Sequence, residues 1–165
     1  MAVERLTPDD APALHAAILR SRELHHPWSA PPDTLDGVRA WLAVPESTSI
    51  RFGIRTGDGA LAGVVNLNGT VRGVFHNAYL GYFALAPHHG QGHMKAGLQQ
   101  VMAQAFGPLG LHRLEANVQP GNTRSAGLVR ALGFRLEGHS PRYLFLDGAW
   151  RDHDRYAITA EEWSV

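Results

Sequence analysis

The chain has 165 residues, which is enough for one well-packed domain and short for two. Fifteen Lys and Arg residues balance fifteen Asp and Glu residues, so no basic excess favours nucleic acid or an anionic membrane as a partner. The absence of cysteine excludes a disulfide framework, a thiolate metal site and a cysteine nucleophile. No signal peptide and no apolar run of about 18 residues is visible, so one cytoplasmic domain over residues 1–165 is expected.

Apolar spacing and turn residues divide the N-terminal half into short elements. Thr7 followed by Pro8 and two acids is a helix-start signal, because a hydroxyl caps the first turn and proline suits its first position. Three prolines between residues 25 and 32 favour a loop. In chain order, this half predicts an edge strand at 3–6, a helix from 8 to about 23, a helix that begins after Asp33 or Thr34, a strand at 50–54, a returning strand at 61–67 and a loop at 68–77.

The C-terminal half predicts a similar alternation. Asn122 or Thr123 caps a short helix, Gly133 follows that helix, and Asp147-Gly148 suits a two-residue hairpin turn. In chain order, this half predicts a buried strand at 79–85, a helix at 94–105, a strand at 112–118, a helix from about 123 to 132, extended segments at 134–136 and 142–146, and a strand at 150–159. The expected fold class is α/β, with one mixed, largely antiparallel sheet and helices on its faces.

The segment after the strand at 79–85 holds two closely spaced glycines, in His89-Gly90-Gln91-Gly92-His93. A helix start carries unpaired N–H groups and a partial positive charge, and glycine lets a bulky anion approach the backbone. The spacing fits neither a P-loop nor a dinucleotide-binding turn, since the latter needs a third glycine where Lys95 stands. The segment predicts a phosphate-binding turn, with an ordinary tight turn as the alternative.

This turn resembles the acetyl-CoA loop Q/R-x-x-G-x-G/A of the GCN5-related N-acetyltransferases (GNAT). Gly92 takes the central glycine position, whereas His89 replaces the Gln or Arg and Met94 replaces the final small residue. Later motifs fit the same family: Asn122-x-x-Ser125, Leu132-Gly133-Phe134, Glu137-Gly138 and the tail from Asp147 to His153. Together they cover roughly residues 78–163 and are similar to the RimJ/RimL branch, which acetylates ribosomal-protein N-termini.

The resemblance implies a GNAT fold, in which the central strands splay apart, and acetyl-CoA as co-substrate. Pantetheine would pair with the backbone of the first central strand, and the pyrophosphate would accept hydrogen bonds from N–H groups of the loop. Some of these residues also suit a plainer role in the core, in solvent or as a helix cap. The residues implied to bind acetyl-CoA are Phe83, Ala84, Leu85, Gly90, Gln91, Gly92, His93, Met94, Lys95, Asn122 and Ser125.

The attack of a neutral amine on a thioester needs a group that removes the amine proton and an acid that protonates the leaving thiolate. Ser125 matches a hydroxyl that this branch places near the sulfur, which implies a proton donor or a water anchor. Many relatives carry a catalytic glutamate five residues before the asparagine, but Asn117 stands there. Either Glu115, on the same strand face, is the base, or Asn117 holds a relay water. Tyr143 is a second candidate acid.

Loops are expected to select the acceptor, namely 25–32, 69–76 and the hairpin at 142–147. The side chains expected to contact the acceptor are Trp28, Tyr82 and Arg142. The resemblance implies acetyl transfer to a primary amine, in the first place a protein N-terminus. A small amine (an amino acid, an antibiotic or a polyamine) is the enzymatic alternative. Asn117 in place of a carboxylate also leaves a non-catalytic acyl-CoA-binding domain open.

Ten histidines raise the question of a metal site. The adjacent pairs His25-His26 and His88-His89 are poor chelates, because neighbouring side chains on an extended chain point apart. No metal is therefore expected, and neither nucleic acid nor a membrane is an expected partner. A homodimer is left open.

Overall fold

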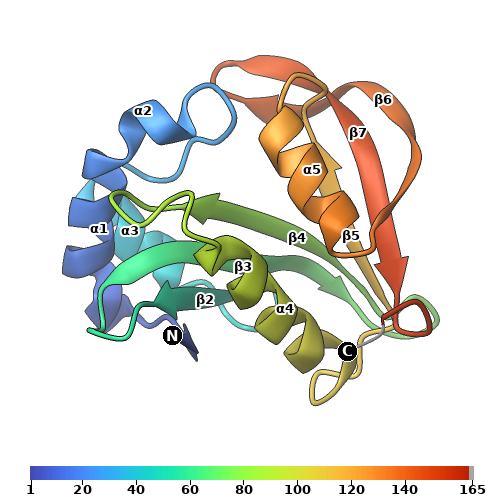
Figure 1. Cartoon of the computed structure of the whole chain (residues 1–165), viewed down its shortest axis with the longest axis horizontal. Helices are drawn as coiled ribbons and strands as arrows, with labels where there is room; N and C mark the ends of the chain where they lie inside the picture. Colours follow the sequence, from blue (N-terminus) through green and yellow to red (C-terminus); the bar gives the residue numbers. More distant parts are fainter. Residues whose placement is uncertain (164–165) are drawn as a thin grey trace.

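The computed structural model describes residues 1–163 and contains a seven-stranded sheet with helices on both faces (Figure 1). The strands are β1 Ala2–Arg5, β2 Ser49–Arg55, β3 Leu61–Val71, β4 Asn77–Ala84, β5 Arg113–Val118, β6 Arg135–Leu146 and β7 Ala149–Thr159. The helices are the 3-10 turn η1 Pro8–Asp10, α1 Ala11–Arg20, α2 Arg22–His25, α3 Leu35–Leu42, α4 His93–Phe106 and α5 Thr123–Ala131. The strand order is β1-β2-β3-β4-β5-β7-β6. The predicted α/β class with one mixed, mostly antiparallel sheet is confirmed.

The two central strands, β4 and β5, separate along their length. They pair in parallel over three residues only, from Asn77 opposite Arg113 to Tyr79 opposite Glu115, whereas the other neighbouring strands of the described chain are antiparallel. Beyond Tyr79, β4 continues beside β3 and β5 continues beside β7. Figure 1 shows the two strands diverging from their shared start. The predicted splay of the central strands is therefore present, and we call the region between their second halves, where the two strands no longer pair, the gap.

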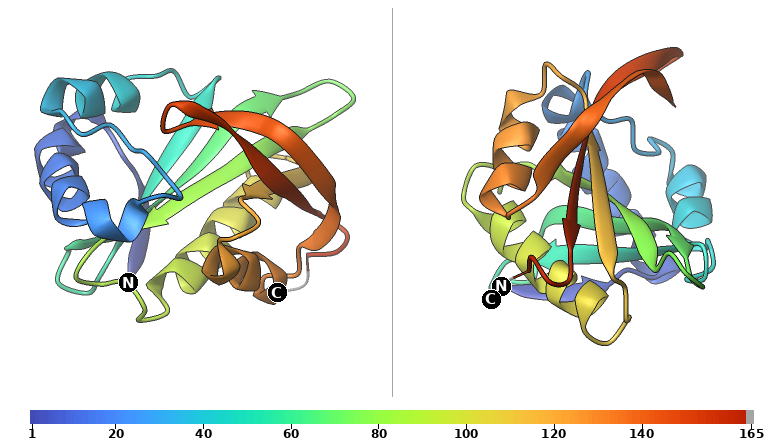
Figure 2. Two further views of the ribbon diagram at one scale, coloured as in Figure 1. Left: turned by 90° about the horizontal axis from the view of Figure 1, so that it is seen from above. Right: turned by 90° about the vertical axis from the view of Figure 1, so that its right-hand side faces the viewer.

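Apolar side chains cover the two faces of the sheet with two separate cores. Helices α4 and α5 pack on one face, where Leu98 and Val129 lie in a cluster with Leu80. Helices α1 and α3 pack on the other, where Leu14 and Val38 lie in a cluster that includes strand residues of β3 and β4. Figure 2 shows the helices on opposite sides of the sheet. Each fully buried aliphatic side chain contributes roughly 1.5–3 kcal/mol, so both cores hold the strands in place.

Short polar side chains set the helix starts that the sequence predicts. Thr7 donates its backbone N–H to Asp10 Oδ2 at 2.8 Å at the entry to η1. Thr34 Oγ1 accepts the N–H of Gly37 at 3.1 Å at the start of α3. Gly133 follows α5 with a φ of 92°, a conformation that costs glycine little. The predicted helix starts are thus confirmed, although the Thr7 hydroxyl bonds to the Asp10 carboxylate rather than to the backbone of the first turn.

The first helix differs from its prediction. The expected helix from 8 to about 23 is divided into η1, α1 and α2. Ser21 lies at the break, buried, and donates its hydroxyl to Ala17 O at 2.7 Å while it accepts the N–H of Ala86 at 2.9 Å. A serine hydroxyl that bonds to backbone competes with the helix, so the chain turns there. The expected loop at 25–32 also begins one residue late, because His25 ends α2.

Two further segments expected as loops or separate strands belong to longer strands. β3 runs to Val71, so the loop predicted at 68–77 is wrong in its first part; there Ser49 donates its hydroxyl to Asn68 Oδ1 at 2.7 Å. The extended segments predicted at 134–136 and 142–146 are both part of β6, which crosses two register shifts against β7. A long strand with a bulge is difficult to predict from sequence, because the bulge interrupts the alternation of apolar and polar residues. Within residues 1–163, no helix is long and apolar enough to cross a membrane.

Candidate active site

The turn before α4 presents a row of backbone donors. Gly90 and Gly92 have φ angles of 76° and 82°, a left-handed conformation that favours glycine. Among residues 1–163, the backbone N–H groups from Gly90 to Lys95 donate no hydrogen bond to a protein atom. The Lys95 side chain is exposed, whereas Met94 packs inward towards Gly63. Unpaired N–H groups and the positive end of a 14-residue helix form an anion site suited to a pyrophosphate.

The edge of β4 that faces the gap consists of every second residue. Leu85 donates its N–H to Ala62 O at 2.9 Å, so the main chain of Leu85 faces β3. In an antiparallel ladder the bonding direction alternates, hence Phe83 also faces β3, and Tyr82 and Ala84 face the gap. The backbone role expected of Phe83 and Leu85 is therefore wrong in register: their side chains are buried in the core below α1 and α3. Ala84 remains a candidate for pairing with a ligand.

A buried histidine, which the sequence analysis placed in a loop, supports this edge. His25 donates from Nε2 to the carbonyl oxygen of Ala84 at 2.8 Å, and its ring packs edge-on against Phe83. Burial lowers the pKa of His25, so the ring is neutral at ordinary pH. No sequence pattern signals this contact, since it joins two segments 59 residues apart.

On the α4/α5 side of the gap, two hydroxyls meet. The hydroxyl groups of Tyr82 and Ser125 lie 2.6 Å apart, and Asn122 Oδ1 accepts the N–H of Ser125 at 3.1 Å as the cap of α5. Burial raises the pKa of Tyr82 to about 12, so this tyrosine stays protonated at ordinary pH. Tyr82 thus lies with Ser125 rather than on the face of Asn117, and its expected contact with the acceptor stays a prediction.

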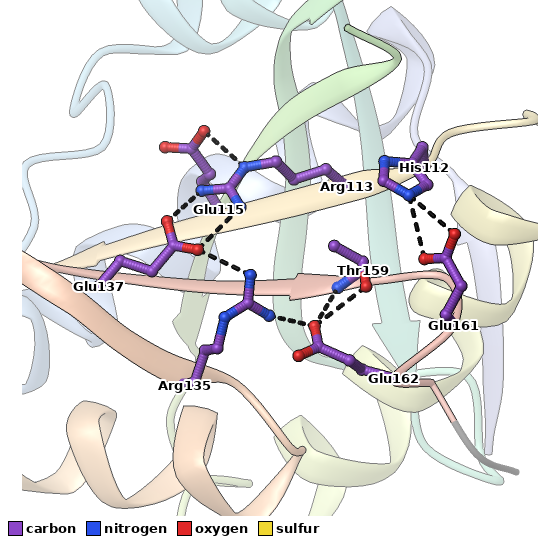
Figure 3. A network of polar contacts seen from close by, with 8 residues as sticks. All are labelled: His112, Arg113, Glu115, Arg135, Glu137, Thr159, Glu161 and Glu162. Atoms are coloured by element: carbon purple, nitrogen blue, oxygen red, sulfur yellow. Dashed lines mark hydrogen bonds and ion pairs between the residues drawn. The ribbon is translucent and has the colours of Figure 1, made fainter.

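Figure 3 shows that Glu115 belongs to a network of ion pairs on β5, β6 and β7. Arg113 donates from Nε to Glu115 Oε1 at 3.1 Å, and it also binds Glu137, which Arg135 contacts at 2.8 Å. The hydrogen bond from Arg113 lowers the pKa of Glu137, and Glu137 in turn raises the pKa of Arg113. The Glu115 carboxylate is therefore already paired with a cation, unlike a free general base.

Asn117 lies two residues further along the same face of β5, beside the gap. Its Oδ1 atom is buried and has no hydrogen-bond partner among residues 1–163, and the same holds for Nε2 of Gln119. Arg155 on β7 stands directly opposite Asn117, and its Nε is also buried without a partner in that range. Buried polar atoms normally have hydrogen-bond partners, so these side chains beside the gap are available to bind a ligand or water.

The remaining expected residues lie around this face at different distances from the gap. Tyr143 lies beside Tyr79, whose pKa is raised by burial and then by the charge of Glu115. Trp28 covers the turn before α5: a Cβ on Gly121 would lie 3.0 Å from the Trp28 ring. Arg142 is exposed at a left-handed bulge in β6, with a φ of 47°. The structure thus brings Tyr143 and Trp28 to the edges of the site.

A metal centre has no support in the part of the chain that the structure describes. No group of three or more His, Asp or Glu side chains in residues 1–163 is arranged to hold an ion. Two of the histidines pair with single carboxylates instead: His139 bonds to Asp154 at 2.9 Å, which raises the pKa of His139, and His112 contacts Glu161 at 3.0 Å.

Comparisons with known proteins agree with this geometry. The [Ribosomal protein uS5]-alanine N-acetyltransferase of Escherichia coli (strain K12) is 39% identical over 104 residues, 63% of this chain and 54% of that enzyme. The chain thus spans about half the length of this curated relative. The structure of Mycobacterium smegmatis RimJ in complex with CoA-disulfide is 30% identical, with a TM-score of 0.88 over 97% of this chain and 82% of that one.

A spermidine N-acetyltransferase, SpeG of Vibrio cholerae, shares the fold with a TM-score of 0.81 over 98% of this chain and 96% of that one, at 20% identity. The sequence profile of the acetyltransferase (GNAT) domain matches residues 1–135. The match covers most of the chain and agrees with the splayed strands and the glycine turn, as the motifs predicted. The chain therefore belongs to the acetyltransferase (GNAT) family.

Proposed function

We propose that the chain transfers the acetyl group of acetyl-CoA to a primary amine, and that this amine is the N-terminus of a protein. The observation that carries the proposal is a set of backbone N–H groups that donate no hydrogen bond within residues 1–163, from Ala84 on the gap edge of β4 to Gly90 to Lys95 at the start of α4. A ligand with two amides and a pyrophosphate suits such a set, because the amides extend the strand and the pyrophosphate meets the helix start.

The residues beside the gap supply the proton transfers that the reaction needs. As the amine nitrogen bonds to the carbonyl carbon and the C–S bond breaks, the thiolate takes a proton. Ser125 donates that proton and regains one from solvent, while Tyr82, which stays protonated, orients the Ser125 hydroxyl through their hydrogen bond. The amine loses its proton to a water that Asn117 Oδ1 holds, since Glu115 is paired with Arg113.

The charges on the sheet face that carries Glu115 and Asn117 favour a peptide over a polyamine as the acceptor. Arg51 and Arg155 lie on this face without a carboxylate partner within residues 1–163, and Glu115 is neutralised by Arg113. A polyamine carries several positive charges and needs acidic side chains to bind it. The E. coli relative is named for an alanine N-terminus of ribosomal protein uS5, which agrees with this choice.

The test is thiol release from acetyl-CoA in the presence of peptides with free N-termini, with mass spectrometry to locate the acetylated amine. We expect acetylation of the α-amine and no turnover with spermidine. Turnover with spermidine alone would favour the small-amine alternative. CoA binding measured by calorimetry, without turnover on any amine, would favour a non-catalytic acyl-CoA-binding domain.

A further inference from the structure

A row of neighbouring residues crosses the sheet on the face of Glu115 and Asn117. Arg51 on β2 stands opposite Asn66 on β3, and Asn66 stands opposite Gly81 on β4. Across the gap, Asn117 on β5 stands opposite Arg155 on β7. Side chains directly opposite each other share a face, so these five residues form one transverse row with Gly81, which has no side chain, at its centre.

Arg51 at one end of the row is a buried cation without a counter-ion. It is 7% exposed, and its Nε has no hydrogen-bond partner among residues 1–163. Arg55, on the same strand, instead binds Asp10 at 2.6 Å and Glu4 at 3.4 Å. Burial without a partner lowers the pKa of Arg51. An unpaired charge in a protein interior is costly, so the missing partner of Arg51 calls for an explanation.

Stacking explains only part of this arrangement. The guanidinium carbon lies 4.4 Å from the centroid of the Trp41 ring, a favourable cation–π contact. The contact supplies no hydrogen-bond acceptor, and Nε of Arg51 finds none elsewhere within residues 1–163. The ring therefore fixes the orientation of Arg51, while the edge of the group remains available to a carboxylate.

The row also supplies a polar path from Arg51 to the gap. Asn66 is buried, and its side-chain Oδ1 has no partner within residues 1–163. A Cβ at Gly81 would lie 3.2 Å from Asn68 Nδ2 and 3.7 Å from Asn66 Nδ2, so these amides lean over the glycine. An extended acceptor whose amine reaches the gap can lie over Gly81 and continue past the two amides towards Arg51.

We propose that Arg51 determines acceptor specificity by binding the carboxylate of an Asp or Glu side chain close behind the acetylated N-terminus. Neighbouring strands lie about 4.8 Å apart, so β2 is roughly 10 Å from β4. An extended chain advances about 3.3 Å per residue, which places the acidic residue at the second to fourth position of the acceptor. A free amino acid is too short, since its carboxylate lies next to its own amine. This inference rests on the proposed function and narrows its substrate class.

The test uses one peptide with a single Glu at its second, third or fourth position, and a matched peptide with Gln there. For wild-type protein we expect kcat/KM to fall by about tenfold to a hundredfold when that Glu becomes Gln at one of these positions, mainly through KM. Equal rates for both peptides at all three positions would overturn the inference, although acetylation itself would still support the proposed function. No acetylation of any peptide would overturn both.

Variants of the protein localise the effect. Arg51→Gln should act equally on the Glu and Gln peptides, with Arg51→Met as a second variant that keeps the stacked stem on Trp41. Arg39→Gln is the matched control, because Arg39 is an exposed arginine on α3 whose contact is Asp36, 3.4 Å away. The control should keep the full preference for Glu. Persistence of that preference in a folded Arg51 variant would show that another group reads the carboxylate.

Discussion

The two faces of the sheet differ in how the polar groups nearest the gap are paired. On the α4/α5 face, buried hydroxyls are paired: Tyr82 with Ser125 at 2.6 Å and Tyr156 with Arg130 at 2.9 Å. On the other face, Asn66 and Asn117 keep buried polar atoms without partners within residues 1–163. Polar groups that are paired with each other stabilise the fold. Buried polar groups without partners destabilise it, a cost that is offset when a ligand binds to them. The contrast distinguishes residues that stabilise the fold from residues that are free to bind a substrate.

The largest effect is expected from charge at the glycine turn. Gly92→Glu should weaken CoA binding by about a hundredfold or more, because the carboxylate repels the pyrophosphate and the left-handed φ of 82° strains any side chain. Calorimetry of CoA binding measures this loss. Gly59→Glu is the matched control: its φ is 87°, its surroundings are open, and it lies in the β2–β3 hairpin. If Gly59→Glu lost CoA affinity and Gly92→Glu kept it, the assignment of the turn before α4 as the CoA site would be contradicted.

A smaller effect is expected from the paired hydroxyls. Ser125→Ala should lower kcat by about a hundredfold and leave the Kd for CoA unchanged, because the thiolate loses its proton donor. Tyr82→Phe removes only the second hydroxyl and should lower kcat by about tenfold. In the double variant the losses should not add, since both groups act on one proton. Wild-type kcat in Ser125→Ala would refute the role.

The pH dependence of stability tests the buried histidine behind β4. The pKa of His25 is lowered in the folded protein, so the unfolded chain binds more protons as pH falls through the ordinary value of 6.5. The free energy of unfolding should therefore decrease below about pH 6.5, with a slope of at most about 1.4 kcal/mol per pH unit from this residue. Urea titrations at several pH values measure the slope. His25→Gln should reduce it, whereas His26→Gln, at an exposed neighbour, should not.

The smallest effect sharpens the contrast between the faces most directly. Asn117→Ala should change the free energy of unfolding by less than about 0.5 kcal/mol or raise it, because it removes a buried atom that has no partner in residues 1–163. Tyr82→Phe, on the satisfied face, should cost about 1 kcal/mol. Thermal unfolding compares the two. An Asn117→Ala variant that is less stable than Tyr82→Phe would make Asn117 a structural residue.

The sequence was sufficient for most elements but not for their details. Periodic apolar residues gave the strand and helix types, and short polar residues such as Thr34 and Asn122 gave the helix starts. The break at Ser21 was missed because it depends on a hydrogen bond to Ala86, 65 residues away. The end of β3 was missed because Asn68 and Gly69 carry the composition of a loop.

The candidate site residues were likewise predicted only where a local pattern marks them. Motifs located the glycine turn, Asn122 and Ser125, and chain spacing located Asn117. Motifs could not tell which residues of β4 turn their backbone towards the gap, because that depends on the register with β3. Arg51 was not predicted as a site residue for a related reason: the sequence does not show whether an arginine is buried or exposed. Tertiary contacts, rather than local pattern, decide such roles.

The short parallel ladder between β4 and β5 divides the sheet into two wings that share only three residue pairs. On the proposed function, a cofactor between the wings would contact both of them and so link the two parts of the sheet. Acetyl-CoA at a hundred times its Kd would add about 2.7 kcal/mol to the free energy of unfolding. If acetyl-CoA binds between the two parts of the sheet as proposed, the stability of the fold would depend on the cofactor concentration.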